Sequence, residues 1–197
     1  MTAQRGFVRR TVALTVTASV AALTLAACGD DGKASGKSGT GGHNAADVSF
    51  SKEMIQHHRQ AVEMASLAAD RASSNRVKSL ATKIRGAQDP EITTMSGWLT
   101  SWGEKVPQDM TGMGHDMSSS TPGMMTGADM GKLEKASGAA FDTMFLNMMV
   151  EHHEGAVDMA KTEKADGGYR PATELATDVI TAQSAEIEQM NKMLGKD

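Results

Sequence analysis

The chain has 197 residues, of which 40% are hydrophobic and only 4% aromatic, and its formal net charge is −4. This length is enough for a single domain with one hydrophobic core. The acidic balance argues against nucleic acid as a partner, because phosphate binding requires a basic surface. With 16 methionines and a single cysteine, thioether rather than thiolate is the abundant sulfur group.

Residues 1–27 have the features of a secretory signal. Three arginines within the first ten residues precede an apolar run, and small residues lead up to Cys28. The run is shorter than the roughly 20 residues that a membrane-spanning helix needs. Its end resembles the lipobox of bacterial lipoproteins, which predicts that Cys28 becomes lipidated. The alternative is an ordinary signal cleaved nearby, with Cys28 incidental.

Removal of the signal would leave an acidic, thiol-poor chain. Residues 1–27 hold three of the twenty basic residues and no acidic one, so the net charge would change from −4 to −7. Residues 29–46 are rich in Gly, Ser, Lys and Asp, and we expect residues 28–46 to be a lipidated cysteine followed by a flexible tether. The predicted location is the extracytoplasmic side of a cell membrane, held by the lipid on Cys28.

An internal repeat organises the remaining chain. Residues 47–99 align without a gap onto residues 142–194, at a constant shift of 95 positions. Both copies contain a Met, then a His-His pair three residues later, and then Ala-Val-x-Met-Ala. The pairs are His57-His58 and His152-His153.

Helical periodicity runs through both copies. Around the first His pair, apolar residues fall on one face and charged residues on the opposite face, which predicts a helix with Asp47 or Ser49 as its N-cap. Residues 76–102 predict a second helix, although Pro90 lies within it. The equivalent stretch of the second copy has no breaker and the register is unbroken, so we expect one helix in which Pro90 leaves the Gly86 carbonyl unpaired. The last helix is expected from about Pro171 to Leu194.

Each copy is therefore predicted to be a helical hairpin that cannot bury its apolar faces alone. Two hairpins would pack as an all-α four-helix bundle over residues 47–195, with an approximate twofold axis. Repeat one would occupy residues 47–99, a Met-rich linker residues 103–138, and repeat two residues 142–194.

The linker has an unusual composition. Methionines recur among Gly, Ser and Thr, a setting with no core of its own to fill, and a short helix is expected at residues 129–136. Thioether sulfur favours Cu(I), and imidazole binds copper readily. The candidate capture site in this segment consists of Met110, Met113, His115 and Met117. The alternative is an ordinary crossover whose methionines dock onto the bundle as adaptable filler.

The two His pairs straddle the predicted buried faces of the repeats. Burying their polar neighbours without partners would cost several kcal/mol in sum, so these groups must pair with something. A metal centre is one solution, with Glu or Gln as ligands or as supports of the ligands. A His–Glu–Gln hydrogen-bond network that braces the bundle is the other, and for some of the methionines core packing is the simpler role. The candidate ligands are His57, His58, His152, His153, Met54, Met149, Met64, Met159, Glu91, Glu186, Met95 and Met190.

The combined motif resembles the family known as domain of unknown function 305. It reads Phe-x-x-x-Met-[Ile/Val]-x-His-His-x-x-Ala-Val-x-Met-Ala, followed by Leu-Ala-Thr and Ala-Gln-x-x-Glu-Ile, and it occurs twice within residues 47–194. The resemblance implies a ferritin-like four-helix bundle, usually secreted or lipid-anchored. It also implies that copper binding through Met and His occurs in some members.

The predicted function is binding of copper as Cu(I), for sequestration or for transfer to a protein not identified by the sequence. A structural or partner-binding lipoprotein is the alternative. A ferritin-like metal oxidase is less favoured, because neither copy has Glu-x-x-His and the predicted inner face offers only Glu91 and Glu186 as carboxylates. We expect no enzymatic activity and no organic cofactor. Copper occupancy should fall below about pH 6, where protons compete for imidazole.

Overall fold

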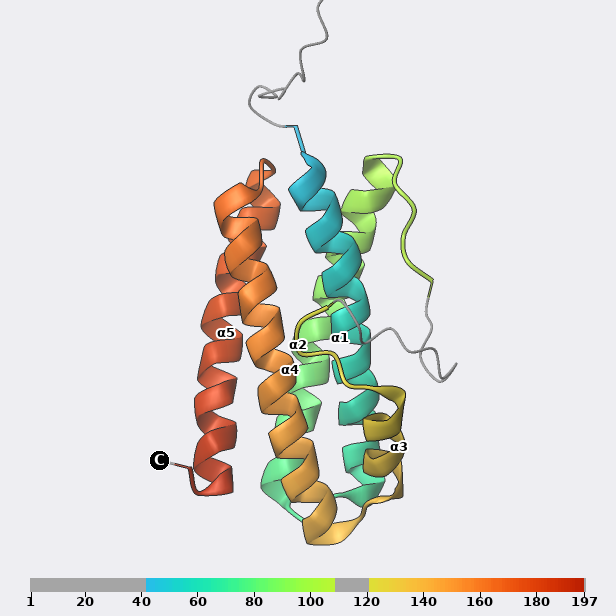
Figure 1. Ribbon diagram of the computed structural model, residues 1–197, viewed down its shortest axis with the longest axis vertical. Helices are drawn as coiled ribbons and strands as arrows, with labels where there is room; N and C mark the ends of the chain where they lie inside the picture. Colours follow the sequence, from blue (N-terminus) through green and yellow to red (C-terminus); the bar gives the residue numbers. More distant parts are fainter. Residues whose placement is uncertain (1–41, 109–120, 197) are drawn as a thin grey trace, which may run out of the picture. The chain divides into compact units, whose positions relative to one another are not determined.

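The computed structural model describes residues 42–108 and 121–196, and all five of its regular elements are α-helices (Figure 1). They are α1 (Ala45–Arg71), α2 (Asn75–Ser101), α3 (Gly127–Lys135), α4 (Gly138–Asp166) and α5 (Arg170–Leu194). Within the described ranges there is no strand, and no helix is both long and apolar enough to cross a membrane. The predicted all-α bundle is confirmed.

The helix ends follow from local sequence. α1 begins after Asn44, whose side chain accepts from backbone N–H groups, while Asp47 at the third helical position accepts the Asn44 N–H. This capping box satisfies donors at both positions. The prediction of Asp47 or Ser49 as the N-cap was therefore wrong, because the N-cap lies three residues before Asp47. α2 continues through Pro90, as the unbroken repeat register predicted.

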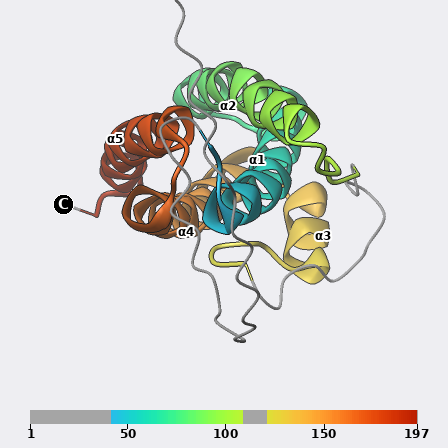
Figure 2. The same cartoon turned by 90° about the horizontal axis from the view of Figure 1, so that it is seen from above.

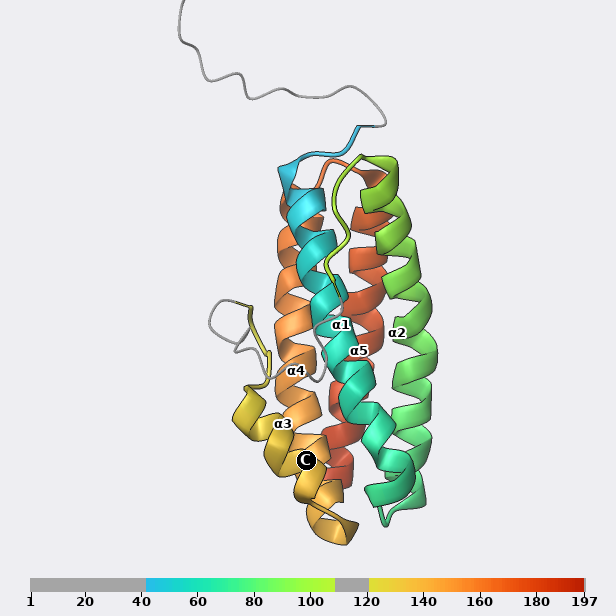
Figure 3. The same cartoon turned by 90° about the vertical axis from the view of Figure 1, so that its right-hand side faces the viewer.

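The second hairpin and the short helix also match the sequence signals. α5 has Pro171 within its first turn and ends at Gly195, which adopts a positive φ of 71°. α3 lies against α1 and α4 (Figure 3). Its Met130 belongs to a core cluster that includes residues of both helices. Met125 and Met130 are both buried, so the expectation that the linker methionines have no core to fill was wrong for these two. For them the filler alternative holds.

The hairpins α1/α2 and α4/α5 meet mainly through α1 and α4, with α3 outside the four long helices (Figure 2). Two aspartates at equivalent positions of the repeats link the two hairpins by hydrogen bonds. Asp47 on α1 accepts from the backbone N–H groups of the α4–α5 connection. Asp142 on α4 accepts from the N–H groups of Ser73 and Ser74 in the α1–α2 connection. Each repeat thus caps the turn of the other.

The interior consists of two apolar cores separated by polar residues. The Phe50 core holds the N-terminal part of α1 and the C-terminal part of α2, and the Phe145 core holds the opposite halves of these helices. Equivalent residues lie in opposite cores, Phe50 and Met54 in one and Phe145 and Met149 in the other. An approximate twofold axis across the bundle produces this exchange, and it passes through the polar residues between the cores.

Candidate metal centre

The four predicted histidines form one buried layer between the two cores. His57 and His58 come from α1, His152 and His153 from α4, and the exposed fraction of each is 0%. Both histidines of each adjacent pair are buried because other elements surround α1 and α4 at this level of the bundle. We refer to these four side chains as the His layer.

The outer rings of the layer are held by carboxylates from the partner helices. His58 Nε2 lies 2.7 Å from Glu91 Oε2, and His153 Nε2 lies 2.7 Å from Glu186 Oε2. A carboxylate oxygen can only accept, so each Nε2 carries a proton and donates it. In the neutral imidazole this leaves Nδ1 with its lone pair. Donation of the second N–H to a carboxylate is how metal-binding histidines are usually oriented.

The central rings face each other across the twofold axis. The ring centroids of His57 and His152 are 3.7 Å apart. His57 Nε2 donates to the backbone carbonyl of Pro122 at 3.1 Å, whereas neither ring nitrogen of His152 has a hydrogen-bond partner among the described residues. Burial, reinforced by the neighbouring histidines, holds the pKa of both His57 and His152 well below the usual value. Both rings are therefore neutral near pH 7, the form that binds metal ions.

Several buried nitrogen and oxygen atoms in and beside the layer have no hydrogen-bond partner among the described residues. The Nδ1 atoms of all four histidines are buried and without a partner among the described residues, as are the Oε1 atoms of Gln88 and Gln183. A bracing network would need these atoms to be paired, because unpaired buried polar atoms cost stability. The His–Glu bonds of the bracing alternative exist, but they use Nε2 and leave Nδ1 free.

Buried methionines lie in the cores on both sides of the layer. Met54, Met95 and Met159 belong to the Phe50 core, and their repeat equivalents Met149, Met190 and Met64 belong to the Phe145 core. All six are buried. Thioethers and neutral imidazoles are the donors that Cu(I) prefers, whereas hard cations need oxygen.

The His layer is not a complete binding site made of nitrogen and oxygen alone. Within residues 42–108 and 121–196, no three His, Cys, Asp or Glu side chains are grouped so as to hold a metal ion. Glu91 and Glu186 already accept from imidazoles, which makes them supports of His58 and His153 rather than free ligands. The donor set fits a soft ion that takes imidazole nitrogen together with thioether sulfur.

Some predicted residues lie outside the described ranges. These are Cys28 and the linker residues Met110, Met113, His115 and Met117. The predictions about lipidation and about a capture site in the linker therefore remain predictions.

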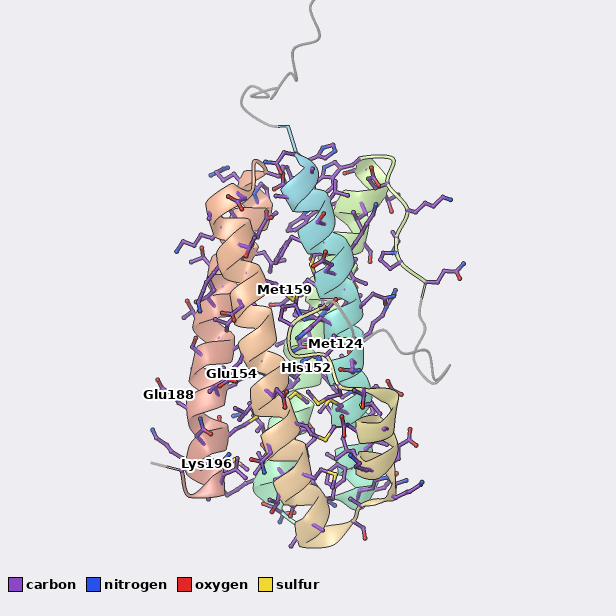
Figure 4. The ribbon with its side chains drawn as sticks, in the orientation of Figure 1. Met124, His152, Glu154, Met159, Glu188 and Lys196 are labelled. Carbon is purple, nitrogen blue, oxygen red and sulfur yellow. The ribbon has the colours of Figure 1, made fainter. Side chains whose placement is uncertain are left out.

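Sequence reasoning missed a segment that lies across the His layer. Residues 121–126, which we call the strap, contact both α1 and α4. Figure 4 shows Met124 of the strap close to His152 on α4, with Met159 further along that helix. The available signals were the Pro122-Gly123 turn sequence and the replacement of Gln60 by Gly155 at equivalent positions of the two repeats.

Solved structures with the same fold include copper-bound proteins. A DUF305 protein from Streptomyces coelicolor is 34% identical, with a TM-score of 0.69, over 77% of this chain and 93% of that one. CopM in its Cu(I)-bound form is 32% identical, with a TM-score of 0.62, over 75% of this chain and 94% of that one. The Cu(II)-bound form of CopM is 35% identical, with a TM-score of 0.65 and the same coverage.

The comparison with protein families agrees with this result. No curated protein matches the chain. The family described as domain of unknown function (DUF305) matches residues 47–194, which include both helical hairpins and the entire His layer. The chain belongs to the DUF305 family.

Proposed function

We propose that this protein binds copper as Cu(I) in the His layer, for sequestration or for transfer to another protein. One observation carries the proposal: among the described residues the Nδ1 atoms of four buried imidazoles have no partner, and buried methionines lie in the cores on either side of the layer. The copper-bound forms of CopM support it, because they show that a protein of similar fold takes up this metal.

Metal binding explains more of the layer than bracing does. In a purely structural network, the Glu91 and Glu186 carboxylates would complete the role of the histidines, and the Nδ1 atoms would stay buried without partners. In a metal site, the same His–Glu bonds fix the ring orientation and the tautomer, and Nδ1 is the ligand atom.

The donor chemistry favours binding over catalysis. A di-iron oxidase surrounds its metals with several carboxylates. The polar zone between the cores offers Glu91 and Glu186, and both accept hydrogen bonds from imidazoles. We therefore assign the layer to a soft ion held by nitrogen and sulfur, with no redox turnover of a substrate.

The setting we propose is the outer face of a membrane, with the chain anchored by a lipid on Cys28. The support is the signal-like sequence of residues 1–27 and the small residues before Cys28. Metabolic labelling with a palmitate analogue tests this part. Label should enter the wild-type protein and be lost in Cys28→Ala, and equal labelling of both would contradict anchoring at this residue.

Competition titration with a Cu(I) chelator tests the binding proposal. The wild-type protein should take copper from the chelator. A variant with His57, His58, His152 and His153 replaced by alanine should not, while circular dichroism confirms that it remains helical. A matched control is Gly97→Ala on α2, where an added methyl group meets open space.

Three results would contradict the proposal. If the wild-type protein leaves the copper with the chelator and the four-alanine variant unfolds, the layer is a structural brace. If the wild-type protein consumes oxygen in the presence of Fe(II), the layer is an oxidase centre. Retention of full Cu(I) affinity by a folded four-alanine variant would move the site elsewhere in the chain.

A further inference from the structure

The strap begins with a turn whose shape is set by its sequence. The Met124 N–H donates to the Thr121 carbonyl at 3.4 Å, and Gly123 has φ of 74°. Proline at the second position and a glycine with positive φ at the third are the features of a type II β-turn. Types I and II differ by a rotation of the central peptide, so the turn type decides where the Pro122 carbonyl points.

Two helices hold this turn in place by different means. On α1, the Gln60 side chain makes two hydrogen bonds with the backbone of Met125, donating to its carbonyl at 2.9 Å and accepting from its N–H at 2.7 Å. On α4, Gly155 lets the turn approach closely, since a Cβ at Gly155 would lie 2.2 Å from the Pro122 oxygen. Gln60 and Gly155 are equivalent positions in the repeat. The repeat thus departs from its symmetry where the strap docks.

The docked turn supplies a contact that the repeat does not supply. His58 and His153 donate to equivalent glutamates, but their neighbours His57 and His152 have no such partner on the helices. The Pro122 carbonyl fills this role for His57, and no described group fills it for His152. The backbone of His57 lies close enough to His152 to raise the pKa of that ring, but it makes no hydrogen bond of ordinary geometry with either ring nitrogen. Among the described residues, His57 is therefore the central ring whose tautomer is held by a hydrogen bond.

We propose that the Pro122–Gly123 turn is a positioning element of the metal centre. It holds His57 in the Nε2–H tautomer and so reserves Nδ1 for the metal. This inference rests on the proposed copper binding and adds a residue pair, Gln60 and Gly155, that acts through the turn. It also makes the two halves of the layer unequal, because the turn makes a hydrogen bond with His57 and none with His152.

The test is Gly155→Ala, with Gly97→Ala as the matched control. The added methyl group at Gly155 must displace the Pro122 carbonyl, whereas at Gly97 it meets nothing within 4 Å. In the apo protein, ¹⁵N spectra of the imidazoles report the tautomer directly. Wild type and Gly97→Ala should show His57 as Nε2–H, and Gly155→Ala should show a mixture. Cu(I) affinity should fall about 10- to 100-fold in Gly155→Ala, the usual effect of losing a partner of a metal-binding histidine.

A second variant perturbs the strap without steric conflict. Gln60→Glu keeps an acceptor for the Met125 N–H but loses the donor to its carbonyl. It should give an intermediate tautomer mixture and an intermediate affinity, so that the two readouts change together across the series. Circular dichroism and urea unfolding verify that all variants are folded.

Two results would overturn the inference while leaving copper binding intact. One is an unchanged His57 tautomer in a folded Gly155→Ala protein, and the other is a changed tautomer with unchanged Cu(I) affinity. Failure of the wild-type protein to bind Cu(I) would overturn the proposed function and the metal role of the turn together. In that event, the apo spectra would still decide whether the turn sets the tautomer.

Discussion

A buried carboxyl pair makes the folding stability of the bundle depend on pH. Glu163 on α4 is 1% exposed, and no described N–H or O–H group donates to either of its oxygens. It faces Asp47, whose carboxylate already accepts from the N–H groups of Gly168 and Tyr169. Two carboxyl groups can form a hydrogen bond only if one is protonated, so Glu163 is the donor. The equivalent position in repeat one is Ala68, so the carboxyl pair has no counterpart at the symmetry-related position of the bundle.

The magnitude follows from the pKa of Glu163. Burial, the bond to Asp47, and the charges of Asp47 and Asp166 raise this pKa from 4.5 to about 8. The unfolded chain ionises from about pH 4.5, while the folded protein resists ionisation until about pH 8. The contribution of Glu163 is thus fully present below pH 4.5 and is lost as the pH rises towards 8. The loss amounts to about 3 kcal/mol between pH 5 and pH 8.

The assay compares wild type with Glu163→Gln by urea unfolding at pH 5, 7 and 8. The glutamine amide donates to Asp47 at every pH. The free energy of unfolding of the variant should therefore lack the pH dependence that ionisation of Glu163 gives the wild type. The difference between the two proteins is the relevant quantity, because neutral His57 and His152 make both less stable below about pH 6.5. Wild type should lose about 3 kcal/mol relative to the variant from pH 5 to pH 8. A pH-independent difference would refute a protonated Glu163.

Three further outcomes test other parts of the structure. Met149→Leu keeps the side-chain volume but removes the thioether, so it should weaken Cu(I) binding in a competition titration, whereas Met130→Leu in α3 should leave it unchanged. Asp142→Ala removes the acceptor of the α1–α2 connection and should cost about 1–2 kcal/mol in urea unfolding, with an unchanged midpoint contradicting the cap. Because the pKa values of His57 and His152 are lowered, Cu(I) should stay bound at pH 6 and leave only in more acidic buffer; release by pH 6 would contradict buried neutral ligands.

The repeat made the bundle predictable. A constant shift without gaps required both copies to have the same helices, which correctly carried α2 through Pro90 against the local breaker signal. The helical register placed both His pairs on the inner face, and all four rings are buried. The bundle and the polar zone between its cores therefore follow from periodicity and duplication.

Features that depend on contacts between distant segments were not predictable in the same way. Asp47 accepts from the backbone of the α4–α5 connection, a contact that spans more than one hundred residues, in addition to its place in the local capping box with Asn44. Met125 and Met130 lie in a composition typical of an exposed loop, yet the strap and α3 bury them against the bundle. For these two methionines tertiary packing overrode a local signal.

The strap had a signal in the sequence, but its meaning required the structure. The exchange of Gln60 for Gly155 breaks an otherwise regular repeat, and Pro122-Gly123 is a turn sequence. Only the structure shows that these features meet at His57, one of the two central rings that have no glutamate partner. A mismatch inside a duplicated motif is therefore a useful guide to function.

The most direct measurement of the central claim is the ¹⁵N imidazole spectrum of the protein with and without Ag(I), a redox-stable substitute for Cu(I). His58 and His153 donate from Nε2 to glutamates, so the metal should perturb their Nδ1 resonances and leave the Nε2–H signals in place. Perturbation of Nε2 with loss of its proton, or no change at any ring nitrogen under saturating Ag(I), would contradict a metal centre in the His layer.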